Sequence, residues 1–334
     1  MRAAASLPAL GLAISGGPHR DPQKSNLILA CGERQLGSQV AVTPQDRWHL
    51  GSLTKAFTAT LVARYVDAGL LSWSTTIGSV LDDRIRGMCP EYRPTTILHL
   101  LSHRSGIPAH PIDWAALRYP REERDPRASR MSFAETILSE TPVARAGDRF
   151  IYANRGYIVL GAMLEVLFGT PWEQQISQRL LLGLGMRNFG FGAPGTPGRL
   201  DQPVGHASWI TASQTPHPPG SQITDNPAIW GPAGRLHTDL PDLLAFLKAH
   251  RDRTSLVKPA TWSMLRTPPF GGDYALGWYI SPNRLWHDGT NTLFNARAFV
   301  SLDGSTCAAA VCNDGDYGRS QPALQRALET AMPA

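Results

Sequence analysis

Short apolar runs bounded by turn residues lie near both ends of the chain, whereas its middle carries longer runs at helical spacing. Near the N-terminus, Leu10 to Ser15 and Asn26 to Cys31 predict two strands joined by a turn over Gly16 to Pro22. Near the C-terminus, four runs predict an antiparallel meander: Ala275 to Ile280, Arg284 to His287, Ala296 to Leu302 and Thr306 to Cys312. A last helix is expected from about Pro322 to Met332.

The middle of the chain predicts several helices. One begins at Ser52, with Gly51 and Ser52 as its N-terminal turn and cap and Gly69 as a left-handed stop. Three more are expected at Asn154 to Phe168, Trp172 to Leu182 and Asp239 to His250. The stretch His206 to Trp230 is polar and rich in proline, which favours a loop that could rim a binding site.

Strands at opposite ends of a chain can share a sheet only if the two ends meet. The predicted fold is therefore α/β, of the α+β type, with an antiparallel sheet flanked by terminal helices. The helical middle is an insertion into that sheet. We expect a sheet domain from residues 1–51 and 270–334, a helical domain from 52–269, and the active site at their junction.

Composition narrows the function classes. The 334 residues are 42% hydrophobic and 18% charged, so the chain can bury a large core. The net charge of +5 comes mostly from scattered arginines, with no basic run and interleaved aromatic residues, which argues against nucleic-acid binding. No apolar run approaches the roughly 20 residues of a membrane span.

The cysteines and the first residues give two further expectations. Cys31, Cys89, Cys307 and Cys312 form no C-x-x-C pair and have no histidine at metal-ligand spacing, so we predict no metal site and leave their disulfide status open. The stretch from Met1 to Ser15 lacks a clear signal-peptide cleavage site. A cytoplasmic location is therefore favoured over a secreted one, with the compartment left open.

Ser52 and Lys55 carry the most informative chemistry. Residues three apart share a helix face, so the Lys55 amine can reach the Ser52 hydroxyl and take its proton. At a helix N-terminus, unpaired N–H groups favour a developing oxyanion. The plainer alternatives are that Ser52 is only a helix cap and that Lys55 is a solvated lysine. Because the chain has only four lysines, we prefer a partly buried Lys55 whose pKa is lowered by desolvation.

The order of several motifs resembles the serine β-lactamase and penicillin-binding-protein superfamily. It is closest to the class C-like branch, which includes D-amino-acid peptidases and family VIII carboxylesterases. The S-x-x-K motif is followed by Tyr152-Ala153-Asn154 and by His287-Asp288-Gly289. Three further segments match that branch: Leu100 to Pro108, Leu184-Gly185-Met186 and Gly231 to Gly234. The resemblance covers nearly the whole chain.

The resemblance implies roles for five residues beyond Ser52 and Lys55. Tyr152 would lie beside both and shuttle a proton to the leaving group as a phenolate favoured by the lysine ammonium, although it could be only a buried core phenol. Asn154 would hydrogen-bond Lys55 and the substrate's acyl side, or simply cap a helix. Gly289 would let substrate approach the strand, and Thr290 N–H would be the second oxyanion donor beside Ser52 N–H. His103 is expected to be structural.

The fifth residue, His287, departs from the K-T-G form of the third motif. A lysine there would offer a permanent cation to a carboxylate, whereas imidazole near its reference pKa of about 6.5 is mostly neutral at pH 7. Carboxylate recognition is thereby put in doubt, although Arg297 is a possible partner. Lowering the pH is expected to charge the ring.

The expected protein is a cofactor-independent serine hydrolase acting through an acyl-enzyme on Ser52. Small neutral esters are the first choice of substrate, followed by D-amino-acid amides or peptides and then by β-lactams. A rival reading is a non-enzymatic relative that senses a ligand or serves as a scaffold. The intact S-x-x-K and Y-x-N motifs argue against it, and the oligomeric state stays open.

Overall fold

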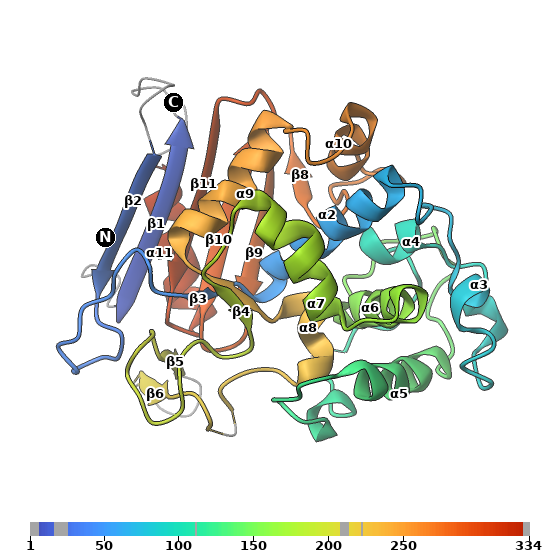
Figure 1. The fold of residues 1–334 in the computed structure, drawn as a ribbon, viewed down its shortest axis with the longest axis horizontal. Coiled ribbons are helices and arrows are strands. Elements are labelled where there is room, and N and C mark those ends of the chain that lie inside the picture. Colours follow the sequence, from blue (N-terminus) through green and yellow to red (C-terminus); the bar gives the residue numbers. More distant parts are fainter. Residues whose placement is uncertain (1–6, 17–25, 111, 208–213, 222, 330–334) are drawn as a thin grey trace.

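Strands from the two ends of the chain share the main sheet of the protein (Figure 1). The computed structural model describes residues 7–16, 26–110, 112–207, 214–221 and 223–329. Six antiparallel strands run in the order β2-β1-β11-β10-β9-β8. Their bounds are β1 Ala9–Gly16, β2 Asn26–Gly32, β8 Tyr279–Ser281, β9 Arg284–Thr290, β10 Asn295–Ser301 and β11 Thr306–Cys312. The predicted sheet that joins both chain ends is confirmed.

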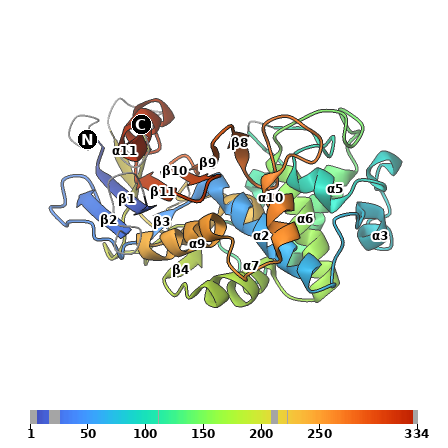
Figure 2. The ribbon, with the colours of Figure 1, turned by 90° about the horizontal axis from the view of Figure 1, so that it is seen from above.

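Both faces of this sheet are covered by helices. Helix α9 (Leu240–Asp252) packs on one face and α11 (Tyr317–Glu329) on the other (Figure 2). Successive residues of β11 therefore point into two different cores, which explains why the whole strand is buried and apolar rather than alternating. Small residues permit this packing: a Cβ on Gly11 would lie 2.8 Å from Val311 Cγ2.

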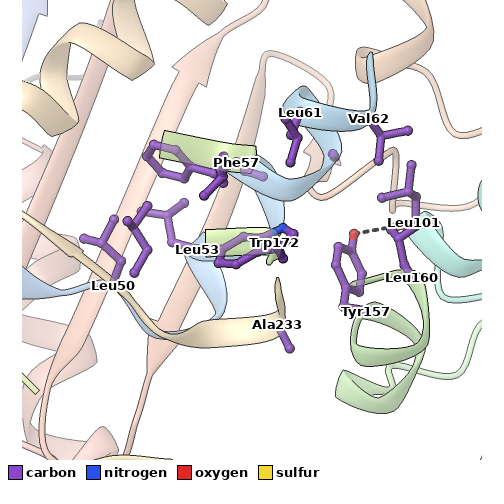
Figure 3. Close-up of a cluster of buried hydrophobic side chains, with 14 of the residues drawn as sticks. Leu50, Leu53, Phe57, Leu61, Val62, Leu101, Tyr157, Leu160, Trp172 and Ala233 are labelled. Carbon is purple, nitrogen blue, oxygen red and sulfur yellow. Dashed lines mark hydrogen bonds between the residues drawn. The ribbon is translucent and has the colours of Figure 1, made fainter. Parts of the chain in front are cut away.

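Helix α2 (Thr54–Asp67) lies between the sheet and the other helices, and it is buried on nearly all sides. Its Phe57 ring stacks on Phe246 of α9, with the ring centroids 3.5 Å apart. Figure 3 shows the buried cluster around this helix, whose labelled members are Leu50, Leu53, Phe57, Leu61, Val62, Leu101, Tyr157, Leu160, Trp172 and Ala233. Burial of such side chains contributes roughly 1.5–3 kcal/mol each.

The remaining elements complete the fold. The α-helices are α3 Ile77–Leu81, α4 Ile97–Leu101, α5 Arg127–Leu138, α6 Asn154–Phe168, α7 Trp172–Ile176, α8 Gly231–Gly234 and α10 Pro259–Arg266. Strands β3 Trp48–His49, β7 Leu236–Thr238 and β4 Phe189–Phe191 form one small sheet, and β5 Gly205–Ala207 and β6 Thr215–His217 form another. Single helical turns of other types span Gly51–Leu53, Pro90–Tyr92, Ala116–Arg118, Ser177–Leu181, Leu182–Leu184 and Ala228–Trp230.

Two predicted elements were wrong in extent. The strand expected from Ala275 begins only at Tyr279, because Gly277 has a positive φ of 77° and lies against α2, where a Cβ would be 2.7 Å from Lys55 O. The helix expected from Trp172 to Leu182 is α-helical only to Ile176 and continues as a π turn and a 3₁₀ turn.

Two more expectations need correction, and others fall outside the described residues. The last helix begins at Tyr317, five residues before Pro322, because Asp316 accepts hydrogen bonds from backbone N–H groups of its first turn. The loop expected over His206 to Trp230 contains the short β5–β6 pair and a 3₁₀ turn. The predicted Gly16 to Pro22 turn after its first residue, and the last helix beyond residue 329, lie outside the described residues.

The predicted domain division and the question of membrane-spanning helices concern the whole chain. The division into a sheet domain (1–51 and 270–334) and a helical domain (52–269) stays a prediction. In the described part of the chain, none of the helices combines the length and apolar character needed to cross a bilayer.

Candidate active site

Ser52 lies in a 3₁₀ turn, Gly51–Leu53, that connects β3 to α2. The sequence predicted that Ser52 caps α2, and this was wrong. Leu53 occupies the position before the helix, and no side chain caps either turn. The Ser52 hydroxyl instead accepts a hydrogen bond of 2.9 Å from Lys55 Nζ. The turn depends on Gly51, whose φ is +50° and whose added Cβ would overlap the backbone of Thr290.

Lys55 is completely buried at the start of α2. Its Nζ donates to Ser52 Oγ at 2.9 Å and to the carbonyl oxygen of Ala233 at 2.6 Å. Desolvation lowers the pKa of Lys55 well below its usual range, as the sequence led us to expect. In the neutral form, the amine can keep its bond to Ala233 while its lone pair accepts the Ser52 proton.

Tyr152 lies on the segment before α6, with its ring centroid 5.0 Å from Lys55 Nζ. Burial raises the pKa of Tyr152 well above its usual value, and a hydrogen bond shared with Ser52 acts in the opposite direction. The expected phenolate is therefore not favoured. The physical reason is that the neighbouring amine is itself desolvated, so it offers little positive charge. A protonated phenol at this place can donate its proton to a leaving group.

Asn154 is the first residue of α6 and makes neither of the bonds considered for it. Ala153 holds the capping position, and no side chain caps the helix. The Asn154 Oδ1 atom is buried and accepts no hydrogen bond from the described residues, so it does not bind Lys55. Because an unpaired buried carbonyl oxygen is costly, this atom is suited to accept a hydrogen bond from a ligand.

His287 on β9 is buried, and both of its ring nitrogens face protein groups. Its Nδ1 hydrogen-bonds the carbonyl oxygen of Asp288, which requires a proton on Nδ1 and leaves Nε2 to accept from Tyr274 Oη at 3.2 Å. Burial and the nearby Lys55 lower the pKa of His287 to about 3. This pKa agrees with the expectation that the ring is neutral at pH 7. It contradicts the expectation that mild acidification charges the ring.

Gly289 and Thr290 bring β9 against the Ser52 turn. A Cβ on Gly289 would overlap the carbonyl oxygen of Leu50 and lie 3.0 Å from Leu53 N. Gly289 is therefore needed so that the strand backbone can approach the Ser52 turn. The family resemblance implied instead that it lets substrate approach the strand. The backbone N–H groups of Ser52 and Thr290 are consequently carried by two segments in close contact.

Helix α8 closes the other side of Lys55. Thr58 Oγ1 donates to Pro232 O at 2.7 Å, next to the bond from Lys55 to Ala233 O. Gly161 of α6 lets this segment pack closely, because a Cβ there would overlap Pro232. The sequence matched Gly231 to Gly234 to a family segment but did not assign it the acceptor for Lys55.

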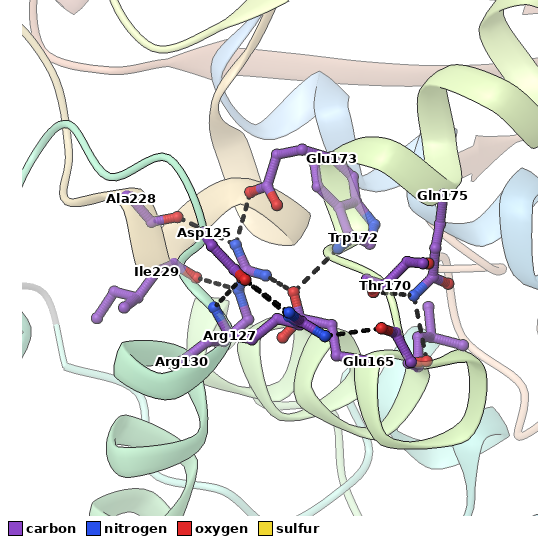
Figure 4. Close-up of polar contacts among 12 residues, drawn as sticks. Asp125, Arg127, Arg130, Glu165, Thr170, Trp172, Glu173, Gln175, Ala228 and Ile229 are labelled. Atoms are coloured by element: carbon purple, nitrogen blue, oxygen red, sulfur yellow. Dashed lines mark hydrogen bonds and ion pairs between the residues drawn. The ribbon is translucent and has the colours of Figure 1, made fainter.

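A cluster of ion pairs contacts the segment that leads into α8 (Figure 4). Arg130 of α5 donates to Ile229 O at 3.1 Å, immediately before α8. It also forms ion pairs with Glu165 of α6 and, at 2.6 Å, with Glu173 of α7. Sequence reasoning missed these three residues because single charges on separate helices form no local pattern. We call Arg130, Glu165 and Glu173 the Arg130 cluster.

Arg297 and the cysteines take no part in the site. Arg297 binds both carboxylate oxygens of Asp288 and Gln325 Oε1, so the expected role as a carboxylate partner was wrong. All four cysteines are free thiols. Within the described ranges, no three His, Cys, Asp or Glu side chains gather as a metal ion would require.

Comparison with known proteins identifies the family. A family model described as Beta-lactamase matches residues 21–331. This chain belongs to the beta-lactamase family. It is 31% identical over 225 residues to penicillin-binding protein 4 of Amycolatopsis lactamdurans, covering 67% of this chain and 56% of that protein. It is 24% identical over 271 residues to the putative penicillin-binding protein PbpX of Bacillus subtilis, covering 81% and 63%. The chain thus spans less than two thirds of the length of these relatives.

Solved structures confirm the fold of this beta-lactamase family member. A penicillin-binding protein from Bacillus halodurans matches with a TM-score of 0.80 and 20% identity, over 99% of this chain and 98% of that one. EstCE1, described as a hydrolase with promiscuous acyltransferase activity, matches at 0.76 and 18%, over 97% and 94%. A D-stereospecific amidohydrolase from Streptomyces sp. matches at 0.72 and 22%, over 96% and 95%.

Proposed function

We propose that this beta-lactamase family member is a serine hydrolase that cleaves small esters or amides through an acyl-enzyme on Ser52. The observation that carries the proposal is the buried amine of Lys55, 2.9 Å from Ser52 Oγ and with a strongly lowered pKa. A general base needs a neutral amine near pH 7 beside the nucleophile, and Lys55 meets both conditions.

The proposed reaction proceeds in two steps. Ser52 Oγ attacks the substrate carbonyl carbon while its proton passes to Lys55 Nζ, and the N–H groups of Ser52 and Thr290 receive the oxyanion. The bond to the leaving group then breaks, and Tyr152 donates a proton to that group and is reprotonated from Lys55. Water, deprotonated by the same amine, attacks the carbonyl carbon of the ester on Ser52. The bond to Ser52 Oγ then breaks, Oγ takes the proton back from Lys55, and the acid is released.

Neutral short-chain esters are the first candidate substrates. His287 is neutral and bonded to protein groups, and Arg297 is held by Asp288, so neither provides a free cation for a substrate carboxylate. This supports uncharged acyl groups over carboxylate-bearing β-lactams. The similarity to the fold of EstCE1 is consistent with esterase activity but does not determine it.

Amides of D-amino acids are the second candidate, and one observation favours them. The buried Asn154 Oδ1 has no donor among the described residues, so it is suited to an acyl group that carries an N–H. A simple alkyl ester would leave that oxygen unpaired. The likeness to the amidohydrolase is in line with this alternative.

Intact-mass profiling tests the proposal. The protein is incubated with a fluorophosphonate, p-nitrophenyl esters, a D-alanyl amide and a cephalosporin, and the labelled peptide is mapped. We expect one fluorophosphonate adduct, on Ser52, and no turnover in Ser52→Ala. Ser139→Ala, a change at an exposed serine of the helical region, is the control. A label on another serine would refute the assignment of Ser52 as the nucleophile. The absence of a label on any serine would refute the proposal and favour a non-enzymatic relative.

A further inference from the structure

Asp225 is a buried carboxylate that joins three segments of the protein. Its Oδ1 lies 3.1 Å from His49 Nε2 and accepts a hydrogen bond of 3.1 Å from Asn291 Nδ2. Its Oδ2 accepts from Arg235 Nε at 3.0 Å. Burial alone would raise the pKa of this carboxyl, but the contacts with His49, Arg235 and Asn291 hold it below its usual value. We call Asp225, His49, Asn291 and Arg235 the Asp225 cluster.

His49 connects Asp225 to the turn that carries Ser52. Its Nδ1 accepts a hydrogen bond of 3.1 Å from Gly51 N–H, so the ring proton lies on Nε2, the nitrogen that is 3.1 Å from Asp225 Oδ1. Gly51 directly precedes Ser52, whose own N–H is one of the two proposed oxyanion donors. The ring therefore fixes the peptide immediately before that donor.

Asn291 connects Asp225 to the turn after β9. Its Oδ1 accepts from the N–H groups of Leu293, at 3.2 Å, and Phe294, at 2.9 Å, while its Nδ2 donates to Asp225. Asn291 directly follows Thr290, whose N–H is the other proposed donor. Asp225 thus contacts Asn291, which adjoins one donor, and His49, which accepts a hydrogen bond from the residue before the other donor.

We propose that Asp225 is a positioning residue that sets the separation of the Ser52 and Thr290 N–H groups. This inference rests on the proposed acyl transfer at Ser52. An oxyanion hole requires donors 2.7–3.1 Å from the oxyanion, so a shift of one segment relative to the other weakens transition-state stabilisation. The position of a backbone donor is set by the segment that carries it, and Asp225 contacts residues of both segments.

The main test compares Asp225→Asn with a matched control, Asp46→Asn. Asp46 is also buried and also binds an arginine, accepting from both Nε and a terminal nitrogen of Arg34. It contacts neither donor segment. We measure kcat and KM for p-nitrophenyl butyrate, normalised to the fraction of sites that a fluorophosphonate labels at completion. In Asp225→Asn, kcat should fall about ten- to hundred-fold with little change in KM, because a displaced donor costs less than a deleted one.

His49→Asn covers the case in which Asp225→Asn fails to fold because Arg235 loses its partner. The asparagine Oδ1 can occupy the place of Nδ1 and still accept from Gly51, but the link to Asp225 is lost. The ion pair between Asp225 and Arg235 remains. We expect kcat to fall in this variant as well. Its melting temperature should change by no more than that of Asp46→Asn.

A spectroscopic readout separates positioning from fold stability. A ¹³C-carbonyl p-nitrophenyl dimethylcarbamate leaves a stable carbamoyl group on Ser52, and its carbonyl stretch reports the hydrogen bonds of the two donors. The stretch should move to higher wavenumber in Asp225→Asn and His49→Asn but not in Asp46→Asn. If all three variants match wild type in the stretch and in normalised kcat, the inference is overturned while the proposed function stands. If wild type itself is not labelled on Ser52, both fail together.

Discussion

The Arg130 cluster and the Asp225 cluster solve the same structural problem with opposite arrangements of charge. Each joins segments far apart in the sequence, and all of their charged groups except the half-buried Glu173 are buried. In the first, one guanidinium lies between the carboxylates of Glu165 and Glu173. In the second, one carboxylate is surrounded by three donor side chains. The Arg130 cluster bonds to the segment that leads into α8, whereas the Asp225 cluster contacts the segments that carry the proposed oxyanion donors.

This difference appears in the pKa values of the carboxyl groups. Burial raises the pKa of Glu165 to about 7, and the charge of Glu173 acts in the same direction against Arg130. Asp225, with three donors and no second carboxylate bonded to it, keeps a pKa below its usual range. The two clusters therefore shift the pKa of a buried carboxyl group in opposite directions, upward for Glu165 and downward for Asp225.

Lys55 bonds to Ser52 and to Ala233 of α8. The largest expected effect is the loss of activity when Lys55 or its proton-transfer partner Tyr152 is replaced. Lys55→Met and Tyr152→Phe should each lower kcat/KM for a p-nitrophenyl ester on the order of 10²- to 10⁴-fold. Because the two groups act on one proton, the double variant should lose little more than the worse single variant. A double variant whose loss equals the product of the two single losses would contradict this coupling.

Removing the central ion of the Arg130 cluster should damage stability far more than the reaction. Arg130→Met leaves two carboxylates without their buried partner and should lower the free energy of unfolding by about 3–5 kcal/mol in urea titrations. Arg127→Met, on the same helix but at an exposed ion pair with Asp125, should leave the urea unfolding curve nearly unchanged. If Arg130→Met instead lowered kcat per labelled site as strongly as Asp225→Asn, the two clusters would not differ in role.

The pH dependence of stability offers a smaller effect. Because the pKa of Glu165 is raised in the folded protein, the unfolded chain releases this proton first, and the free energy of unfolding should fall as pH rises from about 4.5 to 7. Glu165→Gln keeps the acceptor for Arg130 but removes this titration. The variant should therefore gain stability relative to wild type on going from pH 5 to pH 8, on the order of 1–3 kcal/mol.

The control for that titration is Glu135→Gln, at an exposed position of α5. Its difference from wild type should be the same at both pH values within a few tenths of a kcal/mol. Urea unfolding curves at pH 5 and pH 8 supply the comparison. A constant difference for Glu165→Gln as well would mean that this carboxyl does not titrate in the expected range.

The smallest expected effect is the absence of a pH switch at His287. With a pKa of about 3, its ring stays neutral from pH 5.5 to 8. The ratio of kcat/KM for a p-nitrophenyl ester to that for nitrocefin should therefore stay constant within about twofold over this range. A ratio that falls steeply below pH 7 would show that His287 becomes charged and meets the substrate carboxylate.

Part of the site was predictable because its signals are local. The three-residue spacing of Ser52 and Lys55 on a helix face brings their side chains together whatever the surroundings. The lowered pKa of Lys55 was predicted from the scarcity of lysines in the chain, which favoured a buried role for this one. The phenol of Tyr152 was not, since its protonation depends on the charge of its neighbour as well as on its own burial.

By itself, the sequence determined the strands at both ends, the helix after Ser52 and the order of the motifs, because these depend on periodicity and short spacing. Only the tertiary structure decided why Gly289 is needed and which groups hold the Ser52 turn. Gly289 meets the backbone of Leu50, and Asp225 meets donors from positions 49, 235 and 291. A single buried charge or glycine has no pattern along the chain, since its partners are chosen by the packing of distant segments.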